Sequence, residues 1–212
     1  TFESYYKLPA PQTEAENCVA HNGSLIPVPG RDIMVQAWYQ GGVSVFDWTD
    51  PANPVEIAFH DRGPLVTDAT TLGGSWSAYW YNGVIVSSAI VRGLDIFELT
   101  PSPYLTQNEI DAARTVRLDY LNVQGQPTYD WPPSFALARA YLDQLERDGG
   151  LAADAIAGAR GSLGEAESAG GAERRTVLGG LSARLQARAA TAANPGKVRA
   201  LADAVTALAD AG

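Results

Sequence analysis

Residues 43–55 read Val-Ser-Val-Phe-Asp-Trp-Thr-Asp-Pro-Ala-Asn-Pro-Val. The first residues are mostly apolar or β-branched, as in a buried strand, and the rest is rich in Asp, Asn and Pro, as in a turn. Asp47 and Asp50 flank this turn, where carboxylates can accept hydrogen bonds from nearby backbone N–H groups. The stretch therefore predicts a strand, a turn and the start of another strand at Val55.

The same pattern returns 51 residues later in the chain. Residues 32–49 (DIMVQAWYQGGVSVFDWT) align without gaps with residues 83–100 (GVIVSSAIVRGLDIFELT). Gly42 aligns with Gly93, and both stand between apolar runs, where glycine accepts a positive φ at little cost. A repeat of this length with several short strands is typical of the blades of a β-propeller.

Each repeat unit is expected to contain several short strands. The first unit offers four of them, and the second offers three before a Pro-Ser-Pro break at residues 101–103. The expected strands are residues 24–28, 33–39, 43–48 and 55–60 in the first unit, and 76–81, 84–90 and 94–99 in the second. A sheet without its fourth strand has an open edge that another part of a protein could cover.

The N-terminal residues resemble the fourth strand of the first unit. Thr1–Pro11 aligns with Pro54–Pro64 at an offset of 53, which places Tyr6 opposite Phe59. We therefore expect a lone strand near Phe2–Lys7 that belongs to an earlier repeat. On this interpretation the chain is a C-terminal piece of a longer protein.

The stretch from Val43 to Val55 resembles the LVIVD repeat, whose pattern is an apolar-leaning run, Asp, two residues, Asp or Asn, Pro, two residues, Pro and Val. Residues 94–101 resemble a weaker second copy. The resemblance covers roughly residues 1–105 and implies a bacterial β-propeller protein that is secreted, periplasmic or at the cell surface. It implies little about activity, because propellers carry many unrelated functions.

The composition changes near Trp131. Residues 1–131 contain all 5 Trp and carry 6 basic and 15 acidic side chains, which accounts for the whole net charge of -9. Such an acidic balance argues against a nucleic-acid-binding surface. No apolar run is long enough for a transmembrane helix, and a single cysteine, Cys18, excludes a disulfide within the chain.

Apolar residues recur at helical spacing after residue 132. The stripes cover residues 135–145, 152–166, 178–185 and 198–208, and Gly pairs or Asn-Pro-Gly separate them. They predict four short helices in a bundle, and the capping-box pattern from Thr106 to Glu109 predicts an earlier helix through about Thr115. The segment resembles FIMAH, a small helical module at the ends of exported bacterial proteins, in helix pattern and in the run 138–145.

The sequence thus predicts a mixed fold of all-β propeller-type blades, incomplete at about two blades plus one strand, followed by a small all-α helical bundle. A blade fragment is expected over residues 1–105, with units of about 12–64 and 65–105. Residues 106–131 are expected to form a short helix and a linker, and residues 132–212 the bundle.

The candidate binding residues are aromatic or lie just before a predicted strand. Trp and Tyr give a large contact area at low entropic cost, so they can stack on sugars or on a partner peptide. More often such residues fill the space between blades. The candidates are His21, Asn22, Trp38, Tyr39, Trp76 and Trp80.

Metal binding is an alternative role for the few residues with suitable donor atoms. Cys18 and His21 could form half of a site, with His60 and Asp61 as the other half. Their spacing is less regular than in structural zinc sites, which favours ordinary packing roles. Asp47 and Asp50 could likewise bind calcium, but the turn between them favours hydrogen bonds to the backbone.

The sequence indicates no catalytic residue and requires no cofactor, with a divalent metal as the one possible addition. A non-enzymatic exported binding or scaffold protein that mediates protein or cell-envelope interactions is favoured, because two histidines leave little room for His-based catalysis. The alternatives are a metal-dependent hydrolase or lyase whose site is completed by missing blades, and a subunit of a larger envelope assembly. The expected partner is another protein chain or the missing N-terminal blades, and not nucleic acid.

Overall fold

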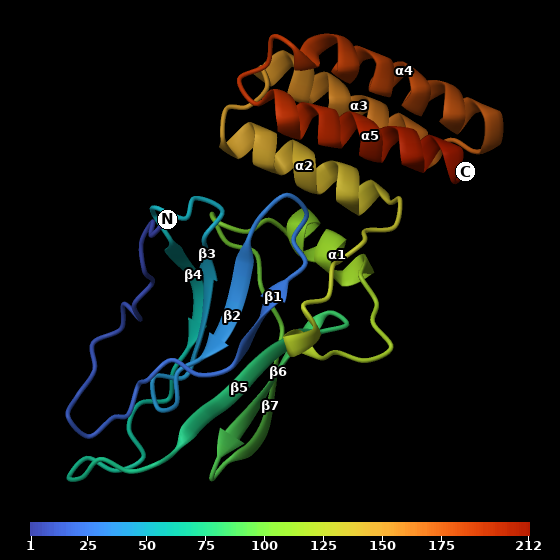
Figure 1. The fold of residues 1–212 in the computed structure, drawn as a ribbon. Helices are drawn as coiled ribbons and strands as arrows, with labels where there is room; N and C mark the ends of the chain where they lie inside the picture. Colours follow the sequence, from blue (N-terminus) through green and yellow to red (C-terminus); the bar gives the residue numbers. More distant parts are fainter. The chain divides into compact units, whose positions relative to one another are not determined.

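The computed structural model describes every residue from Thr1 to Gly212. Seven β-strands come first and five α-helices follow, so the fold is mixed, with β-structure before α-structure (Figure 1). The chain divides into two compact units, Thr1–Leu105 with Ala113–Tyr129, and Thr106–Ala112 with Asp130–Gly212. Residues 106–131 are therefore divided between these units. None of the helices combines the length and apolar character that a membrane crossing requires.

The first four strands form an antiparallel sheet in the order β1-β2-β3-β4. Each strand pairs with its neighbour in the sequence, so the sheet is a meander. Its strands are β1 (Gly23–Ile26), β2 (Ile33–Ala37), β3 (Val43–Asp47) and β4 (Val55–His60).

A second antiparallel meander has three strands in the order β5-β6-β7. Its strands are β5 (Gly74–Tyr81), β6 (Val84–Ile90) and β7 (Gly93–Phe97). All seven strands confirm the expected set, and each boundary lies within two residues of the predicted one.

The hairpins β2-β3 and β6-β7 have the same register at the offset of 51 residues. Val35 pairs with Val45 in the first sheet, and Val86 pairs with Ile96 in the second. The turn glycines also correspond, since Gly42 has a φ of +79° and Gly93 a φ of +92°. The repeat seen in the sequence is therefore a repeat in the structure of the two hairpins.

The repeat does not extend to the first strand of each sheet. Ile33 of β2 pairs with Ile26, whereas Val84 of β6, which is 51 residues later, pairs with Tyr81. The β5-β6 turn is thus shorter than the β1-β2 loop, and β5 also contains a bulge near Ser75.

The two sheets pack against each other through one face each. The backbone N–H of Trp80 in β5 donates to Ser24 Oγ in β1 at 2.8 Å. The core residues on the two packed faces are at most 2% exposed and include Ile33, Val35, Val45, Ala78, Trp80 and Ile85.

The strand expected at Phe2–Lys7 is not formed, and Thr1–His21 contains no strand. Instead the Tyr6 ring stacks on Phe46, with ring centroids 4.0 Å apart, and its hydroxyl is 2.7 Å from Ser44 Oγ. Burial raises the pKa of the Tyr6 hydroxyl, so this group stays protonated. The expectation was wrong because a strand needs a neighbouring strand for its backbone groups, and this segment has none.

The Asp-rich turn between β3 and β4 is held by the two carboxylates. Asp47 Oδ1 accepts hydrogen bonds from the Thr49 backbone N (2.9 Å) and hydroxyl (2.5 Å), and Asp50 Oδ1 accepts one from Ala52 N (3.0 Å). Asp47 Oδ2 accepts two more from the Arg31 guanidinium, at 2.6 and 3.2 Å. The favoured backbone role of both aspartates is confirmed.

No fourth strand follows β7. The residues that stand 51 positions after β4 begin helix α1 (Gln107–Thr115) instead. Glu109 N donates to Thr106 Oγ1 at 3.2 Å and Thr106 N donates to Glu109 Oε2 at 2.8 Å, which is the predicted capping box. Sheets of four and three strands do not close a ring, and the chain contains no closed propeller.

Four helices follow after residue 132, as the apolar stripes predict. They are α2 (Phe135–Arg147), α3 (Ala153–Ser168), α4 (Gly171–Ala189) and α5 (Pro195–Asp210). One continuous core joins them, in which Leu142, Leu163, Leu181 and Leu201 are buried. A short 3₁₀ helix, η1 (Val123–Gly125), precedes them in the chain.

The first residues of α1 belong to this helical unit. The carboxylate of Glu109 is fully buried and accepts hydrogen bonds from Arg147 Nη1 and Nη2 at 2.9 and 3.0 Å. A buried carboxylate requires such a partner, and this ion pair lies within the helical unit, to which Thr106–Ala112 belongs.

Candidate binding site

Three of the candidate aromatic and histidine residues meet where the two sheets join. The His21 ring lies 4.9 Å from the Tyr39 ring and 4.3 Å from the Trp76 ring, and Tyr39 and Trp76 are in edge contact at 5.8 Å. His21 Nδ1 is 2.6 Å from the Trp76 carbonyl oxygen. Trp76 remains 42% exposed, so this aromatic cluster offers a flat ring to a ligand.

The backbone around the aromatic cluster explains why these residues come together. Tyr39 has a φ of +50° and exchanges backbone hydrogen bonds with Ser75 at 2.9 and 2.7 Å. Gly74 lies so close to the Tyr39 carbonyl that a Cβ atom there would collide with it. Only glycine allows β5 to approach Tyr39 in this way.

The other candidate residues have different surroundings. Asn22 is exposed and forms a bridge to Ser77 beside the aromatic cluster. Trp80 is 1% exposed in the core between the sheets, and Trp38 is 7% exposed and in edge contact with Tyr6. Both tryptophans therefore pack within the sheet unit, and the candidates that remain at least partly exposed are His21, Asn22, Tyr39 and Trp76.

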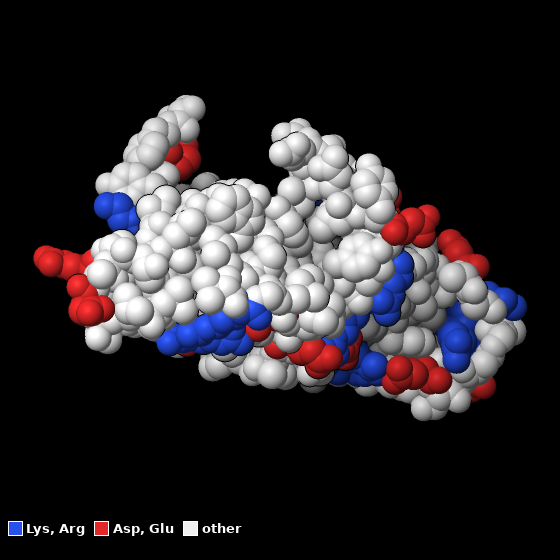
Figure 2. Space-filling view, turned by 90° about the horizontal axis from the view of Figure 1, so that it is seen from below, with Lys and Arg blue, Asp and Glu red and all other residues white.

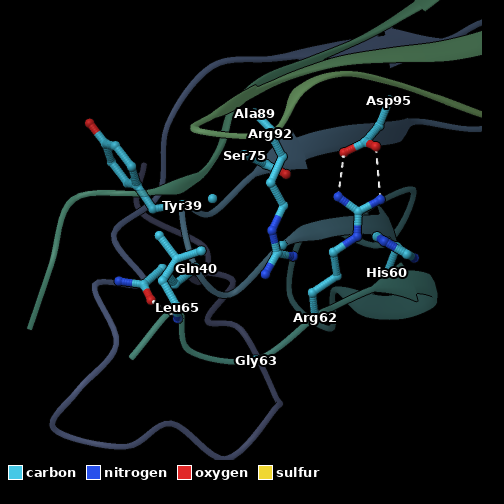
Figure 3. Close-up of a pocket in the computed structure, with 12 residues that line it drawn as sticks. Tyr39, Gln40, His60, Arg62, Gly63, Leu65, Ser75, Ala89, Arg92 and Asp95 are labelled. Atoms are coloured by element: carbon cyan, nitrogen blue, oxygen red, sulfur yellow. Dashed lines mark hydrogen bonds and ion pairs between the residues drawn. The ribbon is translucent and has the colours of Figure 1, made fainter. Parts of the chain in front are cut away.

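A small pocket adjoins the aromatic cluster on the Tyr39 side (Figure 3). Arg62 makes two hydrogen bonds to the Asp95 carboxylate in it, at 2.8 and 3.0 Å. Gln40 is buried and ties two loop positions together through Thr71 O (2.5 Å) and Leu65 N (2.8 Å). Arg92 also lines the pocket, and its guanidinium forms no ion pair.

The structure does not gather the expected metal ligands. His21 contacts aromatic rings, whereas the His60 ring lies 4.6 Å from Phe97, and Asp61 Oδ1 accepts a hydrogen bond from Gly63 N. No group of three or more His, Cys, Asp or Glu residues is arranged to hold a metal ion. Burial, together with nearby carboxylates, raises the pKa of the Cys18 thiol to about 11, which makes it a poor metal ligand or nucleophile.

A second surface lies on the three-stranded sheet, on the face turned away from the four-stranded sheet. Tyr79, Val86 and Ile96 form one cross-strand row on it, and Ser88 and Leu94 form part of the next. Leu94 and Ile96 are each 63% exposed. We call Tyr79, Val86, Leu94 and Ile96 the open face.

The repeat indicates that the open face is suited to packing against another surface. Its residues Val86 and Ile96 correspond to Val35 and Val45, which are buried between the sheets at 0% and 2% exposure. Figure 2 shows one face of the protein, on which residues other than Lys, Arg, Asp and Glu cover a broad area. The sequence did not lead us to predict Leu94 and Ile96 as binding residues, although their alignment with Val43 and Val45 at the offset of 51 was visible in it.

Arg62, Arg92 and Asp95 were also absent from the candidates. They are charged residues at strand ends and turns, and only the packing of the two sheets brings them to one pocket.

No family model matches the chain, and neither a curated protein nor a solved structure matches it. Its own geometry is therefore the basis on which a function can be assigned.

Proposed function

We propose that the protein is a non-enzymatic, exported binding or scaffold protein of propeller type that mediates protein or cell-envelope interactions. The observation that supports this proposal is the open face. Leu94 and Ile96 on it are each 63% exposed, although Val43 and Val45, their equivalents at the offset of 51, are buried in the four-stranded sheet.

The physical argument is that such a face is unfavourable in water. Burying apolar surface stabilises a complex by roughly 25 cal/mol per Å², and contiguous exposed apolar patches commonly mark interaction sites. The aromatic cluster of His21, Tyr39 and Trp76 provides a second contact region in the same sheet unit.

Site-specific photo-crosslinking tests the proposal. A photoreactive side chain at Leu94, in cells that produce the protein naturally, should give discrete adducts with a protein partner. The matched control is Tyr120, which is 76% exposed but lies outside the open face and should give none. Absence of adducts at Leu94 would contradict a binding role for this face.

Metal analysis of the purified protein tests the non-enzymatic part of the proposal. We expect no stoichiometric zinc, calcium or copper, and no change in metal content in His21→Ala. Stoichiometric metal that is lost in His21→Ala would overturn the proposal and favour a metal-dependent hydrolase or lyase.

A further inference from the structure

The outer edge of β7 has no strand beside it. In the four-stranded sheet the equivalent edge, on β3, is covered by β4 from Val43 opposite His60 to Asp47 opposite Val55. β7 pairs only with β6, and its residues make no backbone hydrogen bond to any other element. The edge therefore presents free N–H and C=O groups to an incoming strand.

A second set of unpaired backbone groups lies at the N-terminus. Residues 1–12 make no backbone–backbone hydrogen bond. The segment Phe2–Lys7 is held to the four-stranded sheet by side chains, through Tyr6 on Phe46 and through Ser4 Oγ, which donates to the Pro51 carbonyl at 2.5 Å. Phe2 and Tyr5 are 73% and 69% exposed.

This N-terminal segment resembles a fourth strand in both sequence and position. Glu3 and Tyr6 align with Glu56 and Phe59 of β4 at the offset of 53. Tyr6 lies against Phe46, and His60, one residue beyond the counterpart of Tyr6, lies against Phe97, the repeat equivalent of Phe46.

From this position, Phe2–Lys7 cannot pair with β7 of its own chain. Phe46 and Val45 are neighbours on β3, so their side chains point to opposite faces of the sheet. Tyr6 covers the Phe46 face, whereas the second sheet covers the Val45 face. The donor segment and the acceptor edge of one chain thus lie on opposite sides of the four-stranded sheet.

We propose that Phe2–Lys7 of one copy adds to β7 of a second copy as an antiparallel fourth strand. The inference rests on the proposed function, because the open face of the acceptor sheet lies beside the same edge. Pairing satisfies backbone groups on both sides, and Pro9 and Pro11 end the strand because proline cannot donate to a ladder. Each copy keeps one donor and one acceptor, so association is head to tail.

Light scattering on the chain of residues 1–212 tests this inference. The wild type should self-associate with rising concentration. Ser4→Pro/Tyr5→Pro should be monomeric. Consecutive backbone N–H groups of a strand point to opposite sides, so one of the two prolines removes a hydrogen bond to β7. Neither N–H group is paired with another backbone group in the single chain. Leu94→Lys/Ile96→Lys should also be monomeric, because lysines on an edge strand oppose pairing. The matched control Val55→Lys, on the exposed edge strand β4, should behave as wild type.

Mixing the two monomeric variants is the decisive step. The proline variant retains the acceptor edge on β7, and the lysine variant retains the donor segment Phe2–Lys7. The mixture should therefore form a complex of one copy of each. Circular dichroism should show that both variants are folded. A wild type that stays monomeric, or a mixture that does not associate, would overturn the inference. If the inference fails in this way but Leu94 crosslinks to a different protein, the proposed function is still supported. If self-association occurs without such adducts, the function is assembly of the chain with itself.

Discussion

Gly42 and Gly93 occupy equivalent turns, but their surroundings differ. A Cβ atom at Gly42 would collide with the carbonyl of His60 at the end of β4, whereas one at Gly93 would meet nothing within 4 Å. Both residues have a positive φ, which favours glycine. The difference between them follows from the fourth strand, which only the first sheet possesses.

We therefore expect Gly93→Ala to cost about 1 kcal/mol of unfolding free energy, from backbone strain alone. Gly42→Ala should cost on the order of 3 kcal/mol or more, because the backbone of β4 must also move. Urea unfolding of both variants measures the difference. Equal losses would show that the β4 contact has no energetic weight.

The β3-β4 turn is the element whose stability depends most clearly on pH. Burial alone would raise the pKa of Asp47, but hydrogen bonds from Thr49 and Arg31 outweigh it and hold the pKa below its ordinary value. A lowered pKa in the folded state stabilises the fold at pH values above the unfolded pKa, near 4. This stabilisation is lost as the pH falls through the lower, folded value.

Asp47→Asn should accordingly lower the unfolding free energy by about 2 kcal/mol at neutral pH, since Arg31 loses a charged partner at a largely buried position. The difference from wild type should shrink below about pH 4. Urea unfolding at several pH values measures it, with Asp68→Asn, an exposed loop carboxylate, as the control. A difference that stays constant to low pH would contradict the role of the Asp47 charge.

Most elements could be predicted from the sequence because their signals are local. The turn residues around Asp50 and the alternation in β2 act within a few residues, and the capping box of α1 does the same. The N-terminal strand could not be predicted correctly, because whether Phe2–Lys7 pairs depends on a neighbour and not on its own residues. The grouping of His21 with Trp76 is tertiary, since 55 positions separate them and only sheet packing joins them.

At the scale of the whole molecule, the helical unit has a core of its own. Leu181 is 2% exposed in the middle of it, whereas Ala183 on the same helix is exposed. Leu181→Asp would bury an unpaired carboxylate at a cost of several kcal/mol, which is comparable to the total stability of a small domain. We expect this variant to lose helical circular dichroism.

Ala183→Asp places the same charge in solvent and should retain the wild-type spectrum and melting temperature. The two-unit description would be wrong if Leu181→Asp kept its helicity. It would also be wrong if the sheet unit lost its hairpins in that variant, which backbone hydrogen exchange of β2 and β3 can report.

The sheet unit carries 6 basic and 12 acidic side chains, a net charge of -6 over Thr1–Leu105 and Ala113–Tyr129. Two such units repel each other, and dissolved ions screen that repulsion beyond about 10 Å at 0.1 M ionic strength. Strand addition between copies is therefore opposed by electrostatics and favoured by backbone pairing and apolar contact. Ionic strength therefore shifts the balance between them, and self-association at a given concentration should be weaker in dilute buffer and stronger with added salt.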